Sequence, residues 1–309
     1  MERIAIIGAG LIGRAWAIVF ARAGHPVAVY DNDPSALAEN LRVAEAALAE
    51  LAGGSSSRPK PATVRARIVA AASLADALRG ARYVQESVRE TVAAKQAIFA
   101  ALDALTEPDC ILASSTSYIP ASAFSAGLRG RSRCLVAHPV NPPHVVPVVE
   151  LCPAPWTAPE VVERARRLHE SVRQVPVVVR REIPGFLLNR LQAALVCEAI
   201  RLYEDGYASA EDIDKTIRDG LGLRWSFMGP LETIDLNAPG GVVDYAQRYA
   251  ATMVELNRAQ LPREWNAAAL ARLEAERRAT LPADRLADRA AWRDRRLMAL
   301  AAHKRATEK

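Results

Sequence analysis

The residue types best suited to chemistry in this chain are a histidine, a glutamate and two neutral hydrogen-bonding side chains. Ser117 lies in a serine–threonine cluster, His138 follows it by 21 residues, Glu150 follows by twelve more, and Asn189 comes last. An imidazole exchanges protons near neutral pH, and a neighbouring carboxylate can fix its tautomer. Each residue alone has an ordinary structural alternative. Together they form the set that hydride transfer needs: a base, an orienting carboxylate and two groups that hold an oxygen.

Three glycines near the N-terminus have the spacing of a dinucleotide-binding turn. Gly8, Gly10 and Gly13 enclose Leu11 and Ile12 in the order G-x-G-x-x-G, after an apolar run and before a helical pattern. In this context the first glycine makes the tight turn and the second lets a pyrophosphate approach the backbone. The third allows close helix–strand packing, and the helix N-terminus faces the phosphate charge. A turn that serves packing alone is the alternative.

A single carboxylate indicates which dinucleotide suits this turn. Asp31 follows the second predicted strand, 18 residues beyond Gly13. A carboxylate there accepts hydrogen bonds from the adenosine ribose and repels a 2′-phosphate. No arginine follows closely, since the next residues are Asn32, Asp33 and Pro34. The sequence therefore predicts NAD as the cofactor, in preference to NADP.

Short apolar runs alternate with helical patterns through the first half of the chain. Strands are predicted at residues 4–7, 27–30, 67–70, 83–86, 111–114, 135–137, 148–151 and 175–179, and helices at 12–23, 36–51, 91–105 and 159–172. Several of the strands are apolar without alternation, as in sheets covered on both faces. The pattern predicts an α/β fold with a mostly parallel, doubly wound sheet.

The strand pattern stops before Glu182, and only helices are predicted beyond Phe186. We therefore expect two domains, residues 1–182 for the cofactor and 183–309 for substrate binding and dimerisation. A long helix at 185–205 is apolar on more than one face and must be buried all round. A helical domain of this size can hardly bury that helix alone, so the sequence favours burial in a homodimer interface. Ser209 is expected to cap the next helix.

Composition and charge restrict the classes of protein that fit this chain. The formal charge is +5 over 309 residues, with arginines spread throughout, so a small anionic substrate is favoured over nucleic acid. Four isolated cysteines without metal-ligand spacing indicate buried reduced thiols and no metal site: Cys110, Cys134, Cys152 and Cys197. No apolar run approaches the ~18 residues of a membrane span, and no secretory leader precedes the first strand. A soluble, cytoplasmic protein without membrane partners is expected.

Taken together, these motifs resemble the 3-hydroxyacyl-CoA dehydrogenase superfamily over nearly the whole chain. The matching stretches are GAGLIGRAWA, SSTS, AHPVNPP, PGFLLNRLQ, GLGLRWSFMGPLET and AWRDRRLMALA. The last two are most similar to the L-gulonate 3-dehydrogenase branch, which includes lambda-crystallin, and separate it from the ordinary acyl-CoA enzymes. The resemblance implies a Rossmann-type domain followed by an all-α domain, and oxidation of a 3-hydroxyl with NAD.

The resemblance also implies a role for each candidate site residue. His138 would be the general base that takes the hydroxyl proton, and Glu150 would hold its imidazole. Ser117 and Asn189 would bind the reacting oxygen of the substrate.

Two further residues match cofactor-contact positions of the superfamily. They are Glu90 and Lys95, in the stretch RETVAAK. Without the resemblance they would be interpreted as a carboxylate at a helix start and a solvated lysine.

The choice of substrate depends on one arginine. Arg224 and Trp225 enter where typical acyl-CoA enzymes have a shorter, uncharged stretch. An arginine near the site could clamp a free carboxylate, which suits a small hydroxy acid such as L-gulonate and not a thioester. The alternative is an ion pair of Arg224 inside the helical domain. Carnitine dehydrogenases look similar in this segment, so another 3-hydroxy acid is a second candidate.

A basic stretch leaves CoA thioesters as an alternative substrate class. Arg58, Lys60, Arg65 and Arg67 lie in or beside the loop at residues 53–61, and the corresponding region of acyl-CoA members lies near the CoA tail. A solvated loop is the favoured interpretation. A non-catalytic NAD-binding protein is disfavoured, because no member of the catalytic set is missing.

Overall fold

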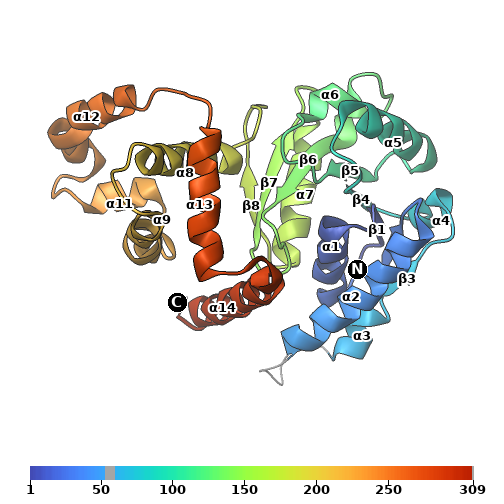
Figure 1. Ribbon diagram of the computed structural model, residues 1–309. Helices are drawn as coiled ribbons and strands as arrows, with labels where there is room; N and C mark the ends of the chain where they lie inside the picture. Colours follow the sequence, from blue (N-terminus) through green and yellow to red (C-terminus); the bar gives the residue numbers. More distant parts are fainter. Residues whose placement is uncertain (53–59, 308–309) are drawn as a thin grey trace. The chain divides into compact units, whose positions relative to one another are not determined.

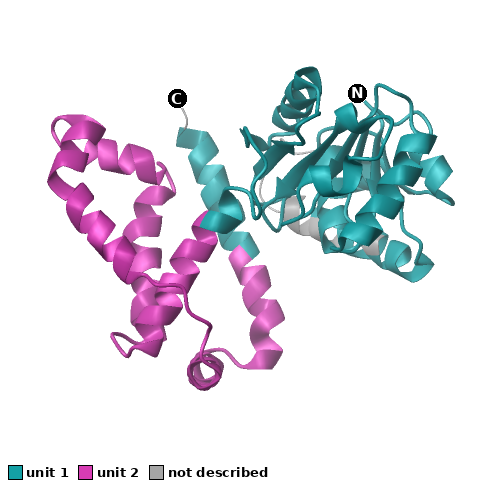
Figure 2. Ribbon diagram, turned by 90° about the horizontal axis from the view of Figure 1, so that it is seen from above, with its two compact units in different colours: residues 1–190, 294–309 teal, residues 191–293 magenta. Residues whose placement is uncertain are grey.

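The computed structural model describes residues 1–52 and 60–307 and divides into two compact units (Figure 2). Unit 1 comprises Met1–Arg190 and Asp294–Lys309, and unit 2 comprises Leu191–Arg293. The division falls inside helix α8 (Leu188–Glu204), and the domain boundary expected near Glu182 stays a prediction. Most of the basic loop, Arg58 included, lies outside the described residues.

Unit 1 contains one eight-stranded sheet with the order β3-β2-β1-β4-β5-β6-β7-β8. The strands are β1 (Ile4–Ile7), β2 (Val27–Tyr30), β3 (Ile68–Ala70), β4 (Tyr83–Glu86), β5 (Ile111–Ser114), β6 (Cys134–Pro139), β7 (Val148–Pro153) and β8 (Val175–Val178). Paired neighbours are parallel except β6 and β7, which are antiparallel. The predicted α/β fold is confirmed, and β6 runs further than predicted, through His138 and Pro139.

Helices cover both faces of this sheet (Figure 1). They are α1 (Leu11–Arg22), α2 (Pro34–Ala52), α3 (Pro61–Arg65), α4 (Leu74–Leu78), α5 (Val92–Leu105), α6 (Ala121–Ser125) and α7 (Pro159–Ser171), with a 3₁₀ turn η1 (Arg131–Arg133). Successive strand residues point to opposite faces. Ile4 and Ile6 therefore join the core around Trp16, whereas Ile7 joins a second core with Phe99. Burial on both faces explains why the strand sequences are apolar without alternation.

Capping side chains set where several helices begin. Thr91 has an extended backbone, and its hydroxyl accepts a hydrogen bond from the N–H of Ala94, so α5 starts at Val92 and not at the predicted residue 91. The predicted cap at Ser209 is confirmed, because its hydroxyl accepts from the N–H of Asp212 at 3.1 Å.

All regular secondary structure in the described residues of unit 2 is helical. Beyond α8 the chain forms α9 (Ala210–Lys215), a π-helical turn η2 (Thr216–Leu221), α10 (Gly222–Trp225), α11 (Pro230–Leu236), α12 (Gly241–Ala259), α13 (Ala267–Thr280), the 3₁₀ turn η3 (Ala283–Arg285) and α14 (Leu286–Thr307). In its unit 1 part, α14 packs Met298 against the core around Trp16. No helix in the described ranges is long and apolar enough to cross a membrane.

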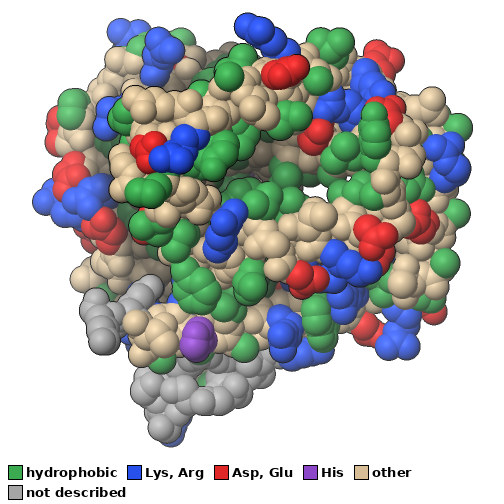
Figure 3. All heavy atoms as spheres, turned by 90° about the vertical axis from the view of Figure 1, so that its left-hand side faces the viewer, with side chains coloured by type: hydrophobic (Ala, Val, Ile, Leu, Met, Phe, Trp, Pro, Cys, Tyr) green, Lys and Arg blue, Asp and Glu red, His purple; other side chains and the backbone are tan. Residues whose placement is uncertain are grey.

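The long helix, which we expected to need a second copy for its burial, is not buried within a single chain, and the predicted burial of one cysteine is wrong. Helix α8 has no buried residue, and Leu191 is 67% exposed. Cys197 on the same helix is exposed, whereas the other three cysteines are buried as predicted. The physical reason is that unit 2 has almost no core of its own: the side chains of its described residues that are buried are Ala210, Thr233, Ala238 and Ala269. Hydrophobic side chains lie between charged ones over much of the face in Figure 3.

Candidate active site

The turn between β1 and α1 has the shape that the glycine spacing predicts. Gly8 has a φ of +103°, and a Cβ there would lie 2.5 Å from the carbonyl oxygen of Ser87. A Cβ on Gly13 would lie 1.9 Å from the carbonyl oxygen of Gly8, so only glycine allows this close helix–strand packing. Around Gly10, in contrast, a Cβ would meet nothing within 4 Å. This open space at the N-terminus of α1 fits a pyrophosphate.

Asp31 is held rigidly beside the glycine turn. Its Oδ2 accepts a hydrogen bond from the N–H of Ala9 at 2.6 Å, and its Oδ1 accepts one from the N–H of Asp33 at 2.9 Å. Each carboxylate oxygen retains a further lone pair for a ribose hydroxyl. The residues present therefore fit an NAD molecule whose pyrophosphate lies on Gly10 and whose ribose lies on Asp31.

His138 and Glu150 face each other across the antiparallel pair β6–β7. The strand register places them directly opposite, and Nδ1 of His138 lies 2.8 Å from Oε2 of Glu150. Both side chains are buried. An ionised carboxylate only accepts hydrogen bonds, so the proton lies on Nδ1 and Nε2 is left as the basic nitrogen.

The second carboxylate oxygen of Glu150 is fixed by the turn that leads into α8. Oε1 accepts hydrogen bonds from the N–H groups of Leu187, at 2.8 Å, and Leu188, at 2.9 Å. In this turn Gly185 and Phe186 have φ values of +76° and +50°, and such values are costly for a bulky side chain. The strained turn therefore aims two amides at the carboxylate that orients the histidine.

These contacts keep Glu150 ionised. Burial raises the pKa of Glu150, but the hydrogen bonds from His138 and from the N–H groups of Leu188 and Leu187 outweigh this effect and hold the pKa below its ordinary value. The carboxylate is thus negative at neutral pH, and a negative charge at this position would stabilise a protonated imidazole.

Asn189 and Ser117 lie against each other although 72 residues separate them. The Nδ2 of Asn189 donates a hydrogen bond to the backbone carbonyl oxygen of Ser117 at 2.7 Å. A second hydrogen on that nitrogen remains for a ligand. The hydroxyl of Ser117 is exposed and makes no hydrogen bond within the described parts of the chain. Through Leu188 and Asn189, which are adjacent in sequence, the structure connects all four predicted site residues.

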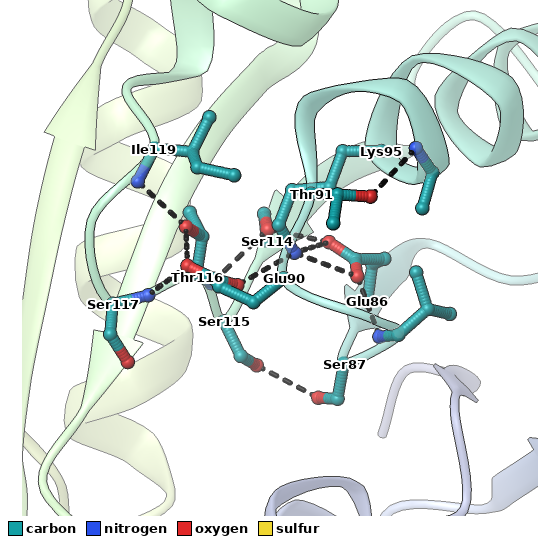
Figure 4. A network of polar contacts seen from close by, with 12 residues as sticks. Glu86, Ser87, Glu90, Thr91, Lys95, Ser114, Ser115, Thr116, Ser117 and Ile119 are labelled. Atoms are coloured by element: carbon teal, nitrogen blue, oxygen red, sulfur yellow. Dashed lines mark hydrogen bonds and ion pairs between the residues drawn. The ribbon is translucent and has the colours of Figure 1, made fainter.

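A network of charged side chains, of which Lys95 and Glu86 are buried, supports the serine–threonine segment (Figure 4). The Nζ of Lys95 lies 3.1 Å from Oε1 of Glu86 and 3.2 Å from Oε2 of Glu90. Lys95 is 1% exposed, so its interpretation as a solvated lysine is wrong: the first turn of α5 packs against the end of β4. Oε1 of Glu90 accepts a hydrogen bond from the N–H of Ser117 at 2.9 Å.

Sequence reasoning missed the polar residues of β4 that hold this network. The Nε2 of Gln85 donates to Oγ of Ser115 at 2.7 Å, and the hydroxyl of Ser114 donates to Oε2 of Glu86. Burial raises the pKa of Glu86, and the charge of Lys95 opposes that rise. The available signal was two polar residues, Gln85 and Glu86, at the end of an otherwise apolar strand.

Arg224 lies in unit 2, where the helical path is irregular. The π-helical turn η2 precedes it, and a Cβ on Gly222 would lie 2.7 Å from the carbonyl oxygen of Ile217. Such turns are frequent at functional sites. Arg224 lines an open pocket of about 600 Å³ together with Thr216, Gly220, Leu221, Leu223 and Phe227.

The guanidinium of Arg224 has no ion pair among the described residues, and it is exposed. Two other arginines of unit 2 behave differently: Arg218 pairs with Asp219 and Glu211, and Arg263 pairs with Glu204 and Asp205. The alternative that Arg224 forms an ion pair inside the helical domain therefore finds no support in the structure.

The dinucleotide turn and the His138–Glu150 pair define a Rossmann-type dehydrogenase. Residues 3–183 match the family model of the 3-hydroxyacyl-CoA dehydrogenase NAD binding domain, and residues 185–277 match that of the C-terminal domain. The chain belongs to the 3-hydroxyacyl-CoA dehydrogenase family and is an NAD-dependent oxidoreductase that acts on a CH–OH group. The predicted family and cofactor are confirmed.

Individual relatives show the range of this family. The lambda-crystallin homolog of Bos taurus is 42% identical over 304 residues, which cover 96% of this chain and 94% of that protein. L-carnitine dehydrogenase of Streptomyces coelicolor is 35% identical over 259 residues, or 82% of this chain and 79% of that protein. A solved NAD⁺-dependent dismutase, 5-formyl-3-hydroxy-2-methylpyridine 4-carboxylic acid 5-dehydrogenase, has a TM-score of 0.82 at 29% identity, with 100% of both chains covered.

Proposed function

We propose that this protein oxidises the 3-hydroxyl of a small hydroxy acid with a free carboxylate, and that L-gulonate is the first candidate. The observation that carries this proposal is the unpaired, exposed guanidinium of Arg224 beside an open pocket. A guanidinium binds a carboxylate through two parallel hydrogen bonds, whereas a thioester offers no such charge. Relatives named for L-carnitine and for a pyridine carboxylic acid support the same class of substrate.

The proposed chemistry follows from the hydrogen-bonded pair of His138 and Glu150. Nε2 of His138 takes the proton of the substrate hydroxyl. NAD, which the glycine turn and Asp31 would hold, would supply the hydride acceptor for the carbon that bears this hydroxyl. Glu150 keeps the imidazole oriented and stabilises its charged form. The hydroxyl of Ser117 and the amide of Asn189 bind the reacting oxygen, which fixes the position of the carbon that bears it. In the direction of reduction, the imidazolium of His138 returns the proton to that oxygen.

We also propose that the protein is a homodimer through unit 2. Large apolar side chains are exposed along α12, among them Val243, Met253 and Leu256. A helical unit with so few buried residues gains the apolar burial it needs from a second copy. A single monomeric species in sedimentation velocity at micromolar concentration would contradict this. The cytoplasmic location expected from the sequence stays a prediction.

Turnover of four alcohols tests the proposed function: L-gulonate, L-carnitine, 3-hydroxybutyrate and 3-hydroxybutyryl-CoA, each with NAD and with NADP. We expect NADH formation with at least one free acid and a preference for NAD. Activity on the CoA thioester alone would overturn the small-acid assignment. Tight NADH binding without turnover of any of the four would favour the non-catalytic alternative.

A further inference from the structure

We propose that the hydroxyl of Ser87 donates a hydrogen bond to an oxygen of the nicotinamide half of the dinucleotide, and that Gln85 and Trp16 are positioning residues that keep this hydrogen available. Ser87 directly follows β4, and its N–H donates to the carbonyl oxygen of Ile7 at the end of β1 at 2.7 Å. This role concerns the cofactor, so it does not depend on which hydroxy acid the protein oxidises.

Ser87 lies on the side of the glycine turn away from Asp31. The sheet order β2-β1-β4 places Asp31, after β2, and Ser87, after β4, on opposite sides of the turn that follows β1. Ser87 is close to that turn, because a Cβ on Gly8 would lie 2.5 Å from its carbonyl oxygen. A dinucleotide lies across the carboxyl ends of the strands at this place in such sheets. With its adenosine ribose on Asp31 and its pyrophosphate on Gly10, its nicotinamide half would extend toward Ser87.

The hydroxyl oxygen of Ser115 uses both of its lone pairs inside the protein. It accepts one hydrogen bond from Nε2 of Gln85 at 2.7 Å and another from Nε1 of Trp16 at 3.2 Å. Neither nitrogen can accept a hydrogen bond in return. The amide of Gln85 cannot be turned round, because Nε2 also donates to the carbonyl oxygen of Ala137 at 3.2 Å, while Oε1 accepts from the hydroxyl of Tyr83 at 2.7 Å.

The direction of the next hydrogen bond follows from these contacts. Oγ of Ser115 lies 2.9 Å from Oγ of Ser87 (Figure 4). Since a hydroxyl oxygen has two lone pairs and those of Ser115 are occupied, Ser115 donates this hydrogen bond and Ser87 accepts it. The hydroxyl hydrogen of Ser87 then has no acceptor in the described part of the chain. Ser87 is half-buried, so this hydrogen can reach a ligand oxygen.

Ser87→Ala tests the donor directly. We expect the Kd for NADH to rise about fivefold, the effect of one neutral hydrogen bond. The Kd for AMP, which lacks the nicotinamide half, should stay within about 1.5-fold of the wild-type value. Isothermal titration calorimetry measures both constants. An unchanged Kd for NADH, or an equal loss of affinity for AMP, would overturn the inference.

A double-mutant cycle tests the positioning role of Trp16. Trp16→Phe removes one donor to Ser115, so Ser87 can then donate to Ser115 instead of to the ligand, and the Kd for NADH should rise about threefold. In the Ser87→Ala background the same substitution should have no further effect, because the two residues act through one hydrogen bond. Additive losses of affinity would contradict this role.

Trp156→Phe is the matched control for this cycle. Nε1 of Trp156 also donates to a serine, Ser125, at 3.2 Å, but Trp156 packs against the core on the opposite face of the sheet from Trp16. This control should leave the Kd for NADH unchanged, and a loss equal to that of Trp16→Phe would overturn the inference. Gln85→Leu removes the other donor to Ser115 and takes the place of Trp16→Phe if that variant does not fold. None of these measurements needs turnover, so they decide the role of Ser87 even if the proposed substrate class is wrong.

Discussion

The His138–Glu150 pair and the turn around Arg224 are built in opposite ways. In the first, both carboxylate oxygens and Nδ1 of the imidazole are hydrogen-bonded inside unit 1. In the second, a charged side chain in unit 2 is exposed and has no ion pair among the described residues. Groups that move protons gain from fixed geometry, whereas a group that selects a ligand must leave its hydrogen bonds available. The contrast fits our proposal that the chemical step and the choice of substrate reside in different parts of the chain.

The largest expected effect is the loss of kcat when the His138–Glu150 pair loses its histidine. His138→Ala removes the base and should lower kcat by at least about 100-fold. NADH should bind with unchanged affinity, because the glycine turn and Asp31 are untouched. Stopped-flow or steady-state NADH formation measures the first quantity, and fluorescence titration measures the second. Full activity in this variant would remove His138 from the mechanism.

A smaller loss is expected when only the orienting charge is removed. Glu150→Gln keeps the shape but lacks the negative charge that stabilises the imidazolium, so kcat should fall about 30-fold. The turn into α8 also loses a charged acceptor for the N–H groups of Leu187 and Leu188. A kcat equal to that of the wild type would show that the contact between β6 and β7 serves structure alone.

Substitution of the unpaired arginine should act on binding and not on the chemical step. Arg224→Met should raise the KM for a free hydroxy acid about 20-fold, the effect of losing a charged hydrogen-bonded pair, while kcat stays within about threefold. Arg258→Met, another arginine of unit 2, is the matched control and should change neither constant. Equal effects of the two substitutions on KM would contradict the proposed role of Arg224 in binding the carboxylate.

The smallest effect concerns stability and a second buried histidine. Burial lowers the pKa of His169 to about 3, and its Nδ1 has no partner, while Nε2 lies 2.9 Å from the hydroxyl of Tyr83. The unfolded chain protonates near pH 6.5 and the folded chain does not, so below this value the unfolded state binds more protons. As the pH is lowered below 6.5, His169 should therefore reduce the free energy of unfolding by about 1.4 kcal/mol for each pH unit.

Urea unfolding between pH 7 and 5 measures this slope. His144 contributes in the same direction, because burial lowers its pKa to about 4. His169→Phe should therefore make the slope shallower without abolishing it. His303→Gln, at an exposed position on α14, should leave the slope unchanged. An unaltered slope in His169→Phe would show that His169 is not neutral in the folded protein.

The sequence predicted those features that depend on local pattern. Uninterrupted apolar runs located the strands, glycine spacing located the cofactor turn, and capping residues such as Ser209 located helix starts. The residue types of the site also suggested its chemistry, since a histidine, a carboxylate and two oxygen-binding groups rarely serve packing together.

Features that depend on register and assembly were not accessible in this way. The ion pair of Glu86 with Lys95 joins a strand to a helix. The polar residues at the end of β4 indicated an unusual site, but the sequence did not show which residue pairs with Glu86. The contact of Glu150 with the N–H groups at the start of α8 depends on the strained backbone at Phe186. The exposure of Cys197 and α8 arises because unit 2 has almost no core within one chain.

The most direct test of the central claim is the ratio of kcat/KM for 3-hydroxybutyrate to that for 3-hydroxybutyryl-CoA, measured with NAD in the wild type and in Arg224→Met. The two substrates share the reacting carbon, and 3-hydroxybutyrate has a free carboxylate where the other substrate has the CoA thioester. The account predicts a wild-type ratio above one that falls about 20-fold in the variant, with NADH affinity unchanged. A wild-type preference for the thioester, or a ratio that does not respond to the loss of Arg224, would contradict it.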